Sequence, residues 1–348
     1  MTYAAHLAGV STSPSALPQS QAKPDVKSSL KRGFAEFLDD GGTDIAATLT
    51  YYAVLSLFPA VIALTSLLGV FGQGKETTKA LIDVLRELGV SDDSRKTIGD
   101  YIDNLQQVDG ASLGLILGLA GALFAASNYV NAFSRAMNTV YGVQEGRPIW
   151  KLRPWMVLIT LIVVVLVMLV AFSLVFTGDI VQAVGNVVGL GDTAVTVWGI
   201  AKWPVMFLVV VGIVGLLYRG TPNVRYPKLR LFSTGALLAI VVWALATAGF
   251  GFYVSQSTSY DATYGALAGV IVLLVWLWIT NIVLILGAEI DSELERSRQL
   301  RSGLPAETEI LLPPRDSSGV TKKAEANQQR VRRMRGIRIK AAAGELEK

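Results

Sequence analysis

Six segments of the chain are each long and apolar enough to cross a lipid bilayer. An α-helix rises about 1.5 Å per residue, so roughly 20 apolar residues cross the ~30 Å of hydrocarbon. A helix also satisfies its own backbone hydrogen bonds where no water is present. The sequence therefore predicts an all-α, polytopic membrane bundle of six transmembrane helices, near residues 47–71, 111–133, 154–177, 194–218, 230–254 and 264–288.

Composition agrees with a membrane protein and excludes several kinds of chemistry. Hydrophobic residues make up 52% of the 348 residues and charged residues 17%, which is too apolar for a soluble domain of this length. The absence of cysteine excludes disulfides and thiolate metal sites. The single histidine, His6, lies in a Ser/Pro/Gln-rich segment, residues 1–30, that we expect to be a disordered cytoplasmic tail. We expect no catalytic residue, no metal site and no cofactor.

Lysine and arginine in the short connections predict the orientation of the spans. The connections after the third and fifth spans contain no basic residue, whereas those after the second and fourth are rich in them. Connections rich in Lys and Arg stay on the cytoplasmic side, so both termini are expected there. The residues concerned are Arg135, Arg147, Lys151 and Arg153 after the second span, and Arg219, Arg225, Lys228 and Arg230 after the fourth.

Three segments outside the spans carry amphipathic or charged patterns. The outer link contains two amphipathic stretches near residues 76–108, which predict short extracytoplasmic helices that either pack on the bundle or serve as a lid or partner surface. The stretch "LKRGFAEFLDDGG" predicts an interfacial helix ending at Gly41. Residues 298–348 are expected to be a solvated, basic cytoplasmic tail, attracted to anionic lipid head groups rather than to nucleic acid.

One helix face near the end of the second span is polar. In "SNYVNAFSRAMN", Asn128, Asn131, Arg135 and Asn138 follow at steps of three, four and three, which is one face of a helix. An arginine that faces lipid costs about 2.5–3.5 kcal/mol even on the lenient insertion scale, so this face should point into the bundle or a wet cavity.

Two acidic or amide residues of the last span are candidate partners for that face. Glu289 closes the span in "NIVLILGAEIDSEL", and Asn281 lies two turns earlier. We hypothesise an ion pair between Arg135 and Glu289. The alternative is that Arg135 is an ordinary interfacial anchor and Glu289 a surface residue. The asparagines fit either interhelical hydrogen bonds or substrate contacts.

Further candidates lie in the first and fourth spans. Tyr51, Tyr52 and the helix kink expected at Pro59 are candidates for lining a substrate path. Lys202 lies near the predicted outer end of the fourth span. Its ammonium group either snorkels to the interface or makes an outer-side substrate contact.

Three stretches resemble a known family. They are "ATLTYYAVLSLFPAVIALTSLLGVFG", "NAFSRAMNTVYG" and "SYDATYGALAGVIVLLVWLWITNIVLILGAEIDSEL", and the likeness to the YihY/BrkB family, which includes the YhjD group, runs from about residue 33 to 297. The resemblance implies a six-helix protein of the bacterial inner membrane with both termini inside. Members have been labelled ribonuclease BN or virulence factor, and the YhjD group is linked to export or handling of envelope lipids. The family supplies no catalytic motif.

Three classes of function are compatible with these patterns: a transporter or flippase-like protein, a scaffold, and, third, an enzyme that acts on a membrane lipid. A transporter or flippase-like protein would move an anionic envelope lipid or an amphipathic metabolite along the polar face. A scaffold would dock a periplasmic or cell-wall protein, and the polar residues would be structural. A ribonuclease is disfavoured, because its carboxylates would have to come from Asp39, Asp40 and Asp44 or from Glu289, Asp291, Glu293 and Glu295. We expect no enzymatic activity and no ATP-driven pumping, since no GxxxxGK loop is present. The sequence specifies neither a coupling ion nor an oligomeric state.

Overall fold

The computed structural model describes residues 22–70, 82, 92, 95–97, 99–100, 111–175, 192–226, 233–256 and 268–343. These residues form long helices, and the only β-type pairing among them is an isolated bridge between Val224 and Pro314. The all-α prediction is confirmed. The helices are α2 (Val26–Asp39), α3 (Gly42–Val70), α6 (Ala111–Val140), α7 (Ile149–Val175), α9 (Asp192–Gly220), α10 (Thr234–Gln256), α12 (Ala268–Arg301) and α13 (Ser318–Ala342).

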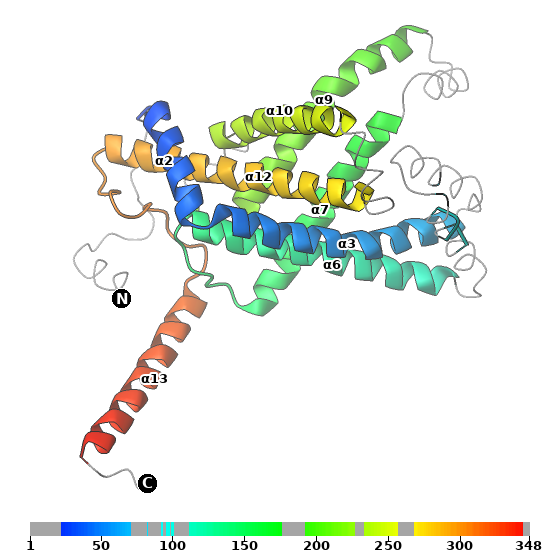
Figure 1. The fold of residues 1–348 in the computed structure, drawn as a ribbon. Helices are drawn as coiled ribbons and strands as arrows, with labels where there is room; N and C mark the ends of the chain where they lie inside the picture. Colours follow the sequence, from blue (N-terminus) through cyan, green and yellow to red (C-terminus); the bar gives the residue numbers. More distant parts are fainter. Residues whose placement is uncertain are drawn as a thin grey trace.

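Six of these helices form a closed ring in chain order. Each of α3, α6, α7, α9, α10 and α12 packs against the next, and α12 returns to pack against α3. In Figure 1, α3 and α6 run side by side along the length of the bundle, while α7 and α9 cross it obliquely. Large buried side chains fill the interior at one end, with the rings of Phe133 and Tyr218 stacked 6.3 Å apart.

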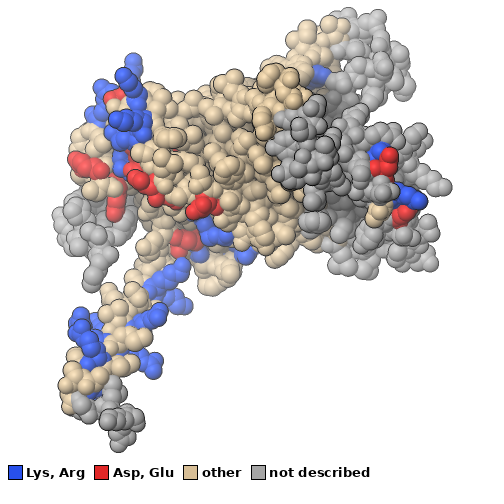
Figure 2. Space-filling model, in the orientation of Figure 1, with Lys and Arg blue, Asp and Glu red and all other residues tan. Residues whose placement is uncertain are grey.

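The outer surface of the bundle is apolar, as a membrane protein requires. Four helices in the described residues are long and apolar enough to span a bilayer: Ile149–Val170 of α7, Thr196–Gly220 of α9, α10 and α12. Their large apolar side chains are exposed, among them Leu169 and Phe207, and such a continuous apolar surface is typical of contact with lipid. On the face seen in Figure 2, the described residues across the middle are uncharged; charges gather around α2 and α13, and a few lie at the opposite end. The count of six spans stays a prediction.

The helix α2 packs across α12 at the end of the bundle that we call the α2 end (Figure 1). The Asp25 carboxylate caps α2 by accepting hydrogen bonds from Ser28. Ser29, Gly33 and Phe37 are buried at spacing four, and a Cβ added to Gly33 would lie 3.0 Å from the Cα of Ile290. The sequence predicted that this helix lies in the membrane interface. Only the face of α2 that points away from α12 fits this prediction, since Phe34 and Leu38 are 54% and 57% exposed there.

The two terminal segments differ from the expected tails. Helix α2 begins at Val26, so residues 26–30 are ordered rather than part of a disordered tail. Likewise α12 continues to Arg301, and a further helix, α13, covers much of the expected basic tail. Because α13 has no buried residue and extends away from the bundle (Figure 1), packing cannot account for it. Its many Ala, Lys, Arg, Gln and Glu residues and its lack of proline favour a helix.

Two sequence predictions lie wholly or mainly outside the described residues. The extracytoplasmic helices expected near residues 76–108 are represented only by residues 82, 92, 95–97 and 99–100, each helical. Pro59, where a helix kink was predicted, lies within the bounds of α3, in a part of the helix whose side chains the structure does not describe. Both stay predictions.

Candidate functional site

The polar face of α6 does not line one path. Asn128 accepts a hydrogen bond from the Arg153 guanidinium at 2.9 Å, whereas Asn138 is buried at the other end of the face and donates to Glu145 at 3.0 Å. Asn131 is half-buried between them. The helical spacing is as predicted, but each partnered residue turns to a different neighbour. The amides of Asn128 and Asn138 therefore make structural hydrogen bonds inside the protein.

The hypothesised ion pair between Arg135 and Glu289 is wrong. Arg135 is exposed, and its guanidinium lies over the ring of Tyr52, 5.9 Å from the centroid. Glu289 is only 1% exposed and forms no ion pair within the described part of the chain. Arg135 does not reach Glu289, because α6 presents Arg135 to α3 at this depth. The end of α12 that carries Glu289 is covered by α2 instead.

Of the remaining predicted residues, the two tyrosines lie together, whereas Asn281 and Lys202 have other partners. Tyr51 is exposed and packs edge-on against Tyr52 at 5.4 Å. Asn281 is buried between helices, where it accepts from the Tyr129 hydroxyl at 2.8 Å and donates to the Thr50 hydroxyl at 3.1 Å. Lys202 is buried, with its ammonium 5.4 Å from the centroid of the Trp203 ring.

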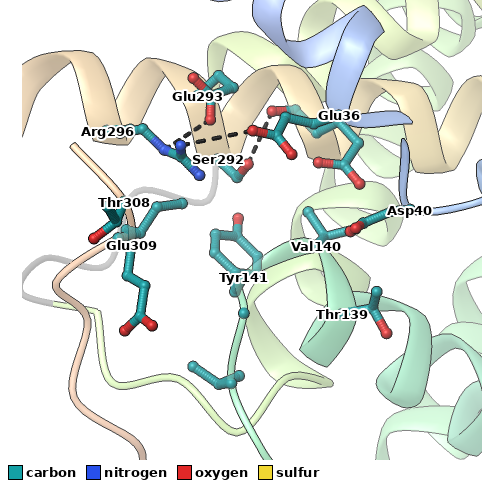
Figure 3. A pocket seen from close by; sticks show the side chains of 14 residues that line it. Glu36, Asp40, Thr139, Val140, Tyr141, Ser292, Glu293, Arg296, Thr308 and Glu309 are labelled. Atoms are coloured by element: carbon teal, nitrogen blue, oxygen red, sulfur yellow. Dashed lines mark hydrogen bonds and ion pairs between the residues drawn. The ribbon is translucent and has the colours of Figure 1, made fainter. Parts of the chain in front are cut away.

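A cavity of about 140 Å³ opens at the α2 end of the bundle. Figure 3 shows four separate parts of the chain around it: the end of α2, the end of α6 with the following turn, α12, and the segment around Glu309. The ring of Tyr141 stands among them and points toward α12. We call it the acidic cavity, because its charged lining consists of Glu36, Asp40, Glu289, Glu293, Glu309 and Arg296.

Two of the five carboxylates in the acidic cavity are paired. Arg296 lies 2.8 Å from Glu293 and 3.6 Å from Glu36 (Figure 3). Glu293 also pairs with Arg32 at 2.8 Å. Both nearby guanidinium groups are therefore already held by carboxylates on α2 and α12. The negative charge of the cavity exceeds its positive charge.

Glu289 is the most deeply buried carboxylate of the cavity apart from the paired Glu293. Its Oε1 atom has no hydrogen-bond partner among the described residues, although the Ser292 hydroxyl donates to the main-chain carbonyl of Glu289 at 3.0 Å. An unpartnered buried oxygen costs about 1–3 kcal/mol, and more when it is charged. Such an atom in the wall of a cavity indicates a site for a donor.

Asp40, at the C-cap of α2, contributes to the same negative potential. Partial burial raises the pKa of Asp40, and the neighbouring Glu36 and Asp39 raise it further. Gly41 follows with a φ of 69°, which turns the chain directly into α3. The short turn holds Asp40 at the mouth of the cavity, so the site depends on the α2–α3 junction.

Sequence reasoning noted both acidic clusters but did not bring them together. The cluster at Asp39 and Asp40 and the cluster after Glu289 are about 250 residues apart in the chain, and only the crossing of α2 over α12 joins them. Within the described residues, no three Asp, Glu or His side chains are arranged to hold a metal ion. The available signal was the spacing of Ser29, Gly33 and Phe37, which gives α2 a face that can pack on another helix.

A second polar cluster beside the cavity holds the C-terminal segment onto the bundle. The Asn223 side chain donates to the carbonyls of Gln144 and Asp316 and accepts from the Asp316 amide. Arg315 donates to three carbonyls at and beyond the end of α9, those of Arg219, Gly220 and Val224. Each group is satisfied inside the protein, so this cluster is structural. It also fixes the segment that carries Glu309.

The carboxylates of this cluster are ionised. Hydrogen bonds from Ser318, followed by the nearby Lys151, lower the pKa of Asp316 to about 2. Burial alone would raise the pKa of Glu145, but hydrogen bonds and charge from Arg147 outweigh it and lower that pKa. The Arg147 guanidinium lies 2.6 Å from Glu145.

The model of the virulence factor BrkB family matches residues 34–310. The chain belongs to the virulence factor BrkB family. It is 31% identical over 272 residues to a ribonuclease-like protein, YfkH, of Bacillus subtilis, covering 78% of this chain and 96% of that one. It is 29% identical to a UPF0761 membrane protein of Alkalilimnicola ehrlichii, over 74% of this chain and 56% of that protein. No solved structure matches the chain.

The BrkB match places the acidic cavity within the family region. Every residue of its lining, from Glu36 to Ile310, lies between residues 34 and 310. The basic helix α13 lies outside that region. The resemblance to this family stated from the sequence motifs is confirmed. The acidic cavity, and not the C-terminal helix, therefore belongs to the part of the chain that defines the BrkB family.

Proposed function

We propose that this BrkB protein is a transporter or flippase-like protein of the bacterial inner membrane, in which the acidic cavity receives the head group of an envelope lipid or amphipathic metabolite. The observation that carries the proposal is the buried, unpartnered carboxylate of Glu289 in the wall of a cavity at the end of an apolar bundle. Ionisable groups at such positions are commonly functional.

The charge of the cavity bears on the substrate. Five carboxylates and one guanidinium line it, so an anionic group entering it would be repelled and a cationic group attracted. The anionic lipid suggested by the polar face of α6 fits this cavity poorly. We propose instead that a positively charged or zwitterionic head group enters it.

The α2 end is proposed to face the cytoplasm. The basic connections that contain Arg147 and Arg225 lie at this end, beside the C-terminal segment, and cytoplasmic loops carry such an excess. The exposed Arg135 is then at the level of the inner head groups, where anionic lipids would contact it. The cavity would accept substrate from the inner leaflet or the cytoplasm.

A scaffold is the second candidate, and one observation favours it. The bundle beside the cavity is filled by fully buried side chains such as Phe133, Tyr218 and Ile285, so a static path does not continue through it. A scaffold for a periplasmic or cell-wall partner needs no path. Transport needs these side chains to move as the cavity opens alternately to the two sides.

We further propose that the protein is not an enzyme. The ribonuclease-like name belongs to YfkH. Hydrolysis of RNA generally needs positioned metal ions or an acid and base pair. The described carboxylates have no metal-holding arrangement, and the acidic cavity would repel a phosphate backbone.

Lipid movement in proteoliposomes tests the proposal. Acyl-labelled fluorescent phosphatidylethanolamine and phosphatidylglycerol would be compared in vesicles with the intact protein, with Glu289→Gln, with Arg135→Ala and without protein. We expect movement of the amine lipid that is lost in Glu289→Gln and kept in Arg135→Ala. Movement of phosphatidylglycerol alone, lost in Arg135→Ala, would instead support transport of an anionic lipid along the polar face of α6. No movement above empty vesicles, with folded protein, would favour the scaffold.

A further inference from the structure

Glu289 is surrounded by charges that leave it no counter-ion. From α2 it faces Glu36 and Asp40, and from α12 it faces Glu293 and Arg296. Glu309 lies on the remaining wall of the cavity. The Arg296 guanidinium, the one cation among these groups, is held by Glu293 and Glu36. A negative charge on Glu289 is therefore disfavoured both by burial and by its neighbours.

We propose that Glu289 holds a proton in the empty cavity and exchanges it for the ammonium group of a primary amine. This inference rests on the proposed function and names the chemistry that the acidic cavity recognises. In the resting state the side chain is a neutral carboxylic acid. In the loaded state it is a carboxylate that accepts N–H hydrogen bonds from the amine.

A primary ammonium fits the cavity better than a metal ion does. No set of three metal-ligating side chains is arranged there within the described residues. An ammonium group carries three N–H donors in a compact head, and the orphaned Oε1 of Glu289 needs a donor. The Tyr141 side chain, which points toward α12 (Figure 3), forms part of the same cavity wall.

The exchange conserves charge within the cavity. The O–H bond of the Glu289 carboxylic acid breaks, and its proton leaves to water. The carboxylate that remains is neutralised by the entering ammonium, so the net charge of the cavity is the same before and after. Such an exchange avoids a large change in desolvation energy. It also makes amine binding and proton binding mutually exclusive, which is the requirement for proton-coupled antiport.

Proton release on amine binding tests the exchange without a membrane. The full chain in detergent, in weakly buffered solution with a pH indicator, would receive ethanolamine chloride or dihexanoyl phosphatidylethanolamine. We expect release of about one proton per chain at saturation. Glu289→Gln should release none. Glu295→Gln is the matched control, since Glu295 lies on the same helix, outside the cavity, and pairs with Arg298 at 3.0 Å.

The two amines distinguish the source of the group. Release with both shows that the ammonium itself is recognised; release with the lipid alone assigns a lipid head group, and release with ethanolamine alone a soluble amine. Sodium chloride and dihexanoyl phosphatidylglycerol should release none. Equal release by tetramethylammonium, which has no N–H donor, would overturn the recognition of a primary amine. No release with either amine would overturn the exchange.

A measurement on the wild-type protein tests the exchange even if the Glu289→Gln variant fails to fold. The infrared carbonyl band of a protonated carboxylic acid should be present without amine and disappear when it is added. Absence of that band in the amine-free protein would also overturn the proposal. Proton release without lipid movement would keep the exchange and remove flippase activity, whereas lipid movement without proton release would keep transport and remove the exchange.

Discussion

Replacing Gly235 by alanine should force α10 away from α12. A Cβ added at Gly235 would lie 2.5 Å from the carbonyl oxygen of Gly287 and 2.9 Å from the amide nitrogen of Asp291. An ordinary contact between a Cβ and another heavy atom is 3.4–4 Å long, so the two helices would have to separate by roughly 1 Å. Since these two atoms belong to the backbone, no side-chain rotation can relieve the overlap.

The expected destabilisation follows from two opposing effects. Overpacking in a tight interface costs about 1–3 kcal/mol, and here the obstruction by backbone favours the upper part of that range. Alanine recovers at most about 1 kcal/mol over glycine through helix propensity, and less at the first turn, where Gly235 lies. The hydrogen bond from the Gly235 amide to Asp291, already 3.4 Å, would lengthen. We expect a net loss of about 2 kcal/mol.

Unfolding in mixed detergent, followed by circular dichroism, measures this difference. The control is Gly249→Ala in the same helix, where an added Cβ meets nothing within 4 Å. It should leave the free energy of unfolding unchanged or raise it by up to ~1 kcal/mol. If Gly235→Ala proves as stable as Gly249→Ala, the close packing of α10 on α12 is not as described.

Three further predictions follow from single contacts. Arg315→Met should lower the free energy of unfolding by about 2–4 kcal/mol, because it removes the guanidinium donor of the Val224 and Arg219 carbonyls; the exposed Arg338→Met should change little. Because the pKa of Asp316 is lowered to about 2, its stabilising effect is present above its unfolded pKa of 3.8 and lost as the pH falls toward 2, so the pH dependence of unfolding should flatten over that window in Asp316→Asn. Arg135→Ala should cost only about 0.5–1 kcal/mol, the value of an exposed cation over the Tyr52 ring, and a larger loss would indicate a partner other than Tyr52.

The polar face of α6 illustrates what could be predicted from the sequence. Spacing along a helix depends on local geometry alone, so the common face of Asn128 and Asn138 was correctly derived. Their partners were not, because Arg153 and Glu145 reach them from the connection and helix that follow. The ion pair proposed for Arg135 failed for the same reason: matching depth in two spans does not establish that the spans face each other there.

The sequence by itself determined the membrane character and the long apolar helices of this BrkB protein. Each depends on about 20 neighbouring residues and on the inability of a bilayer to hydrate a backbone. The acidic cavity was decided by tertiary structure, because it needs α2 to cross α12 and bring Asp40 to Glu289. That crossing depends on close contacts such as Gly33 against Ile290, between residues whose separation in the chain leaves no local pattern.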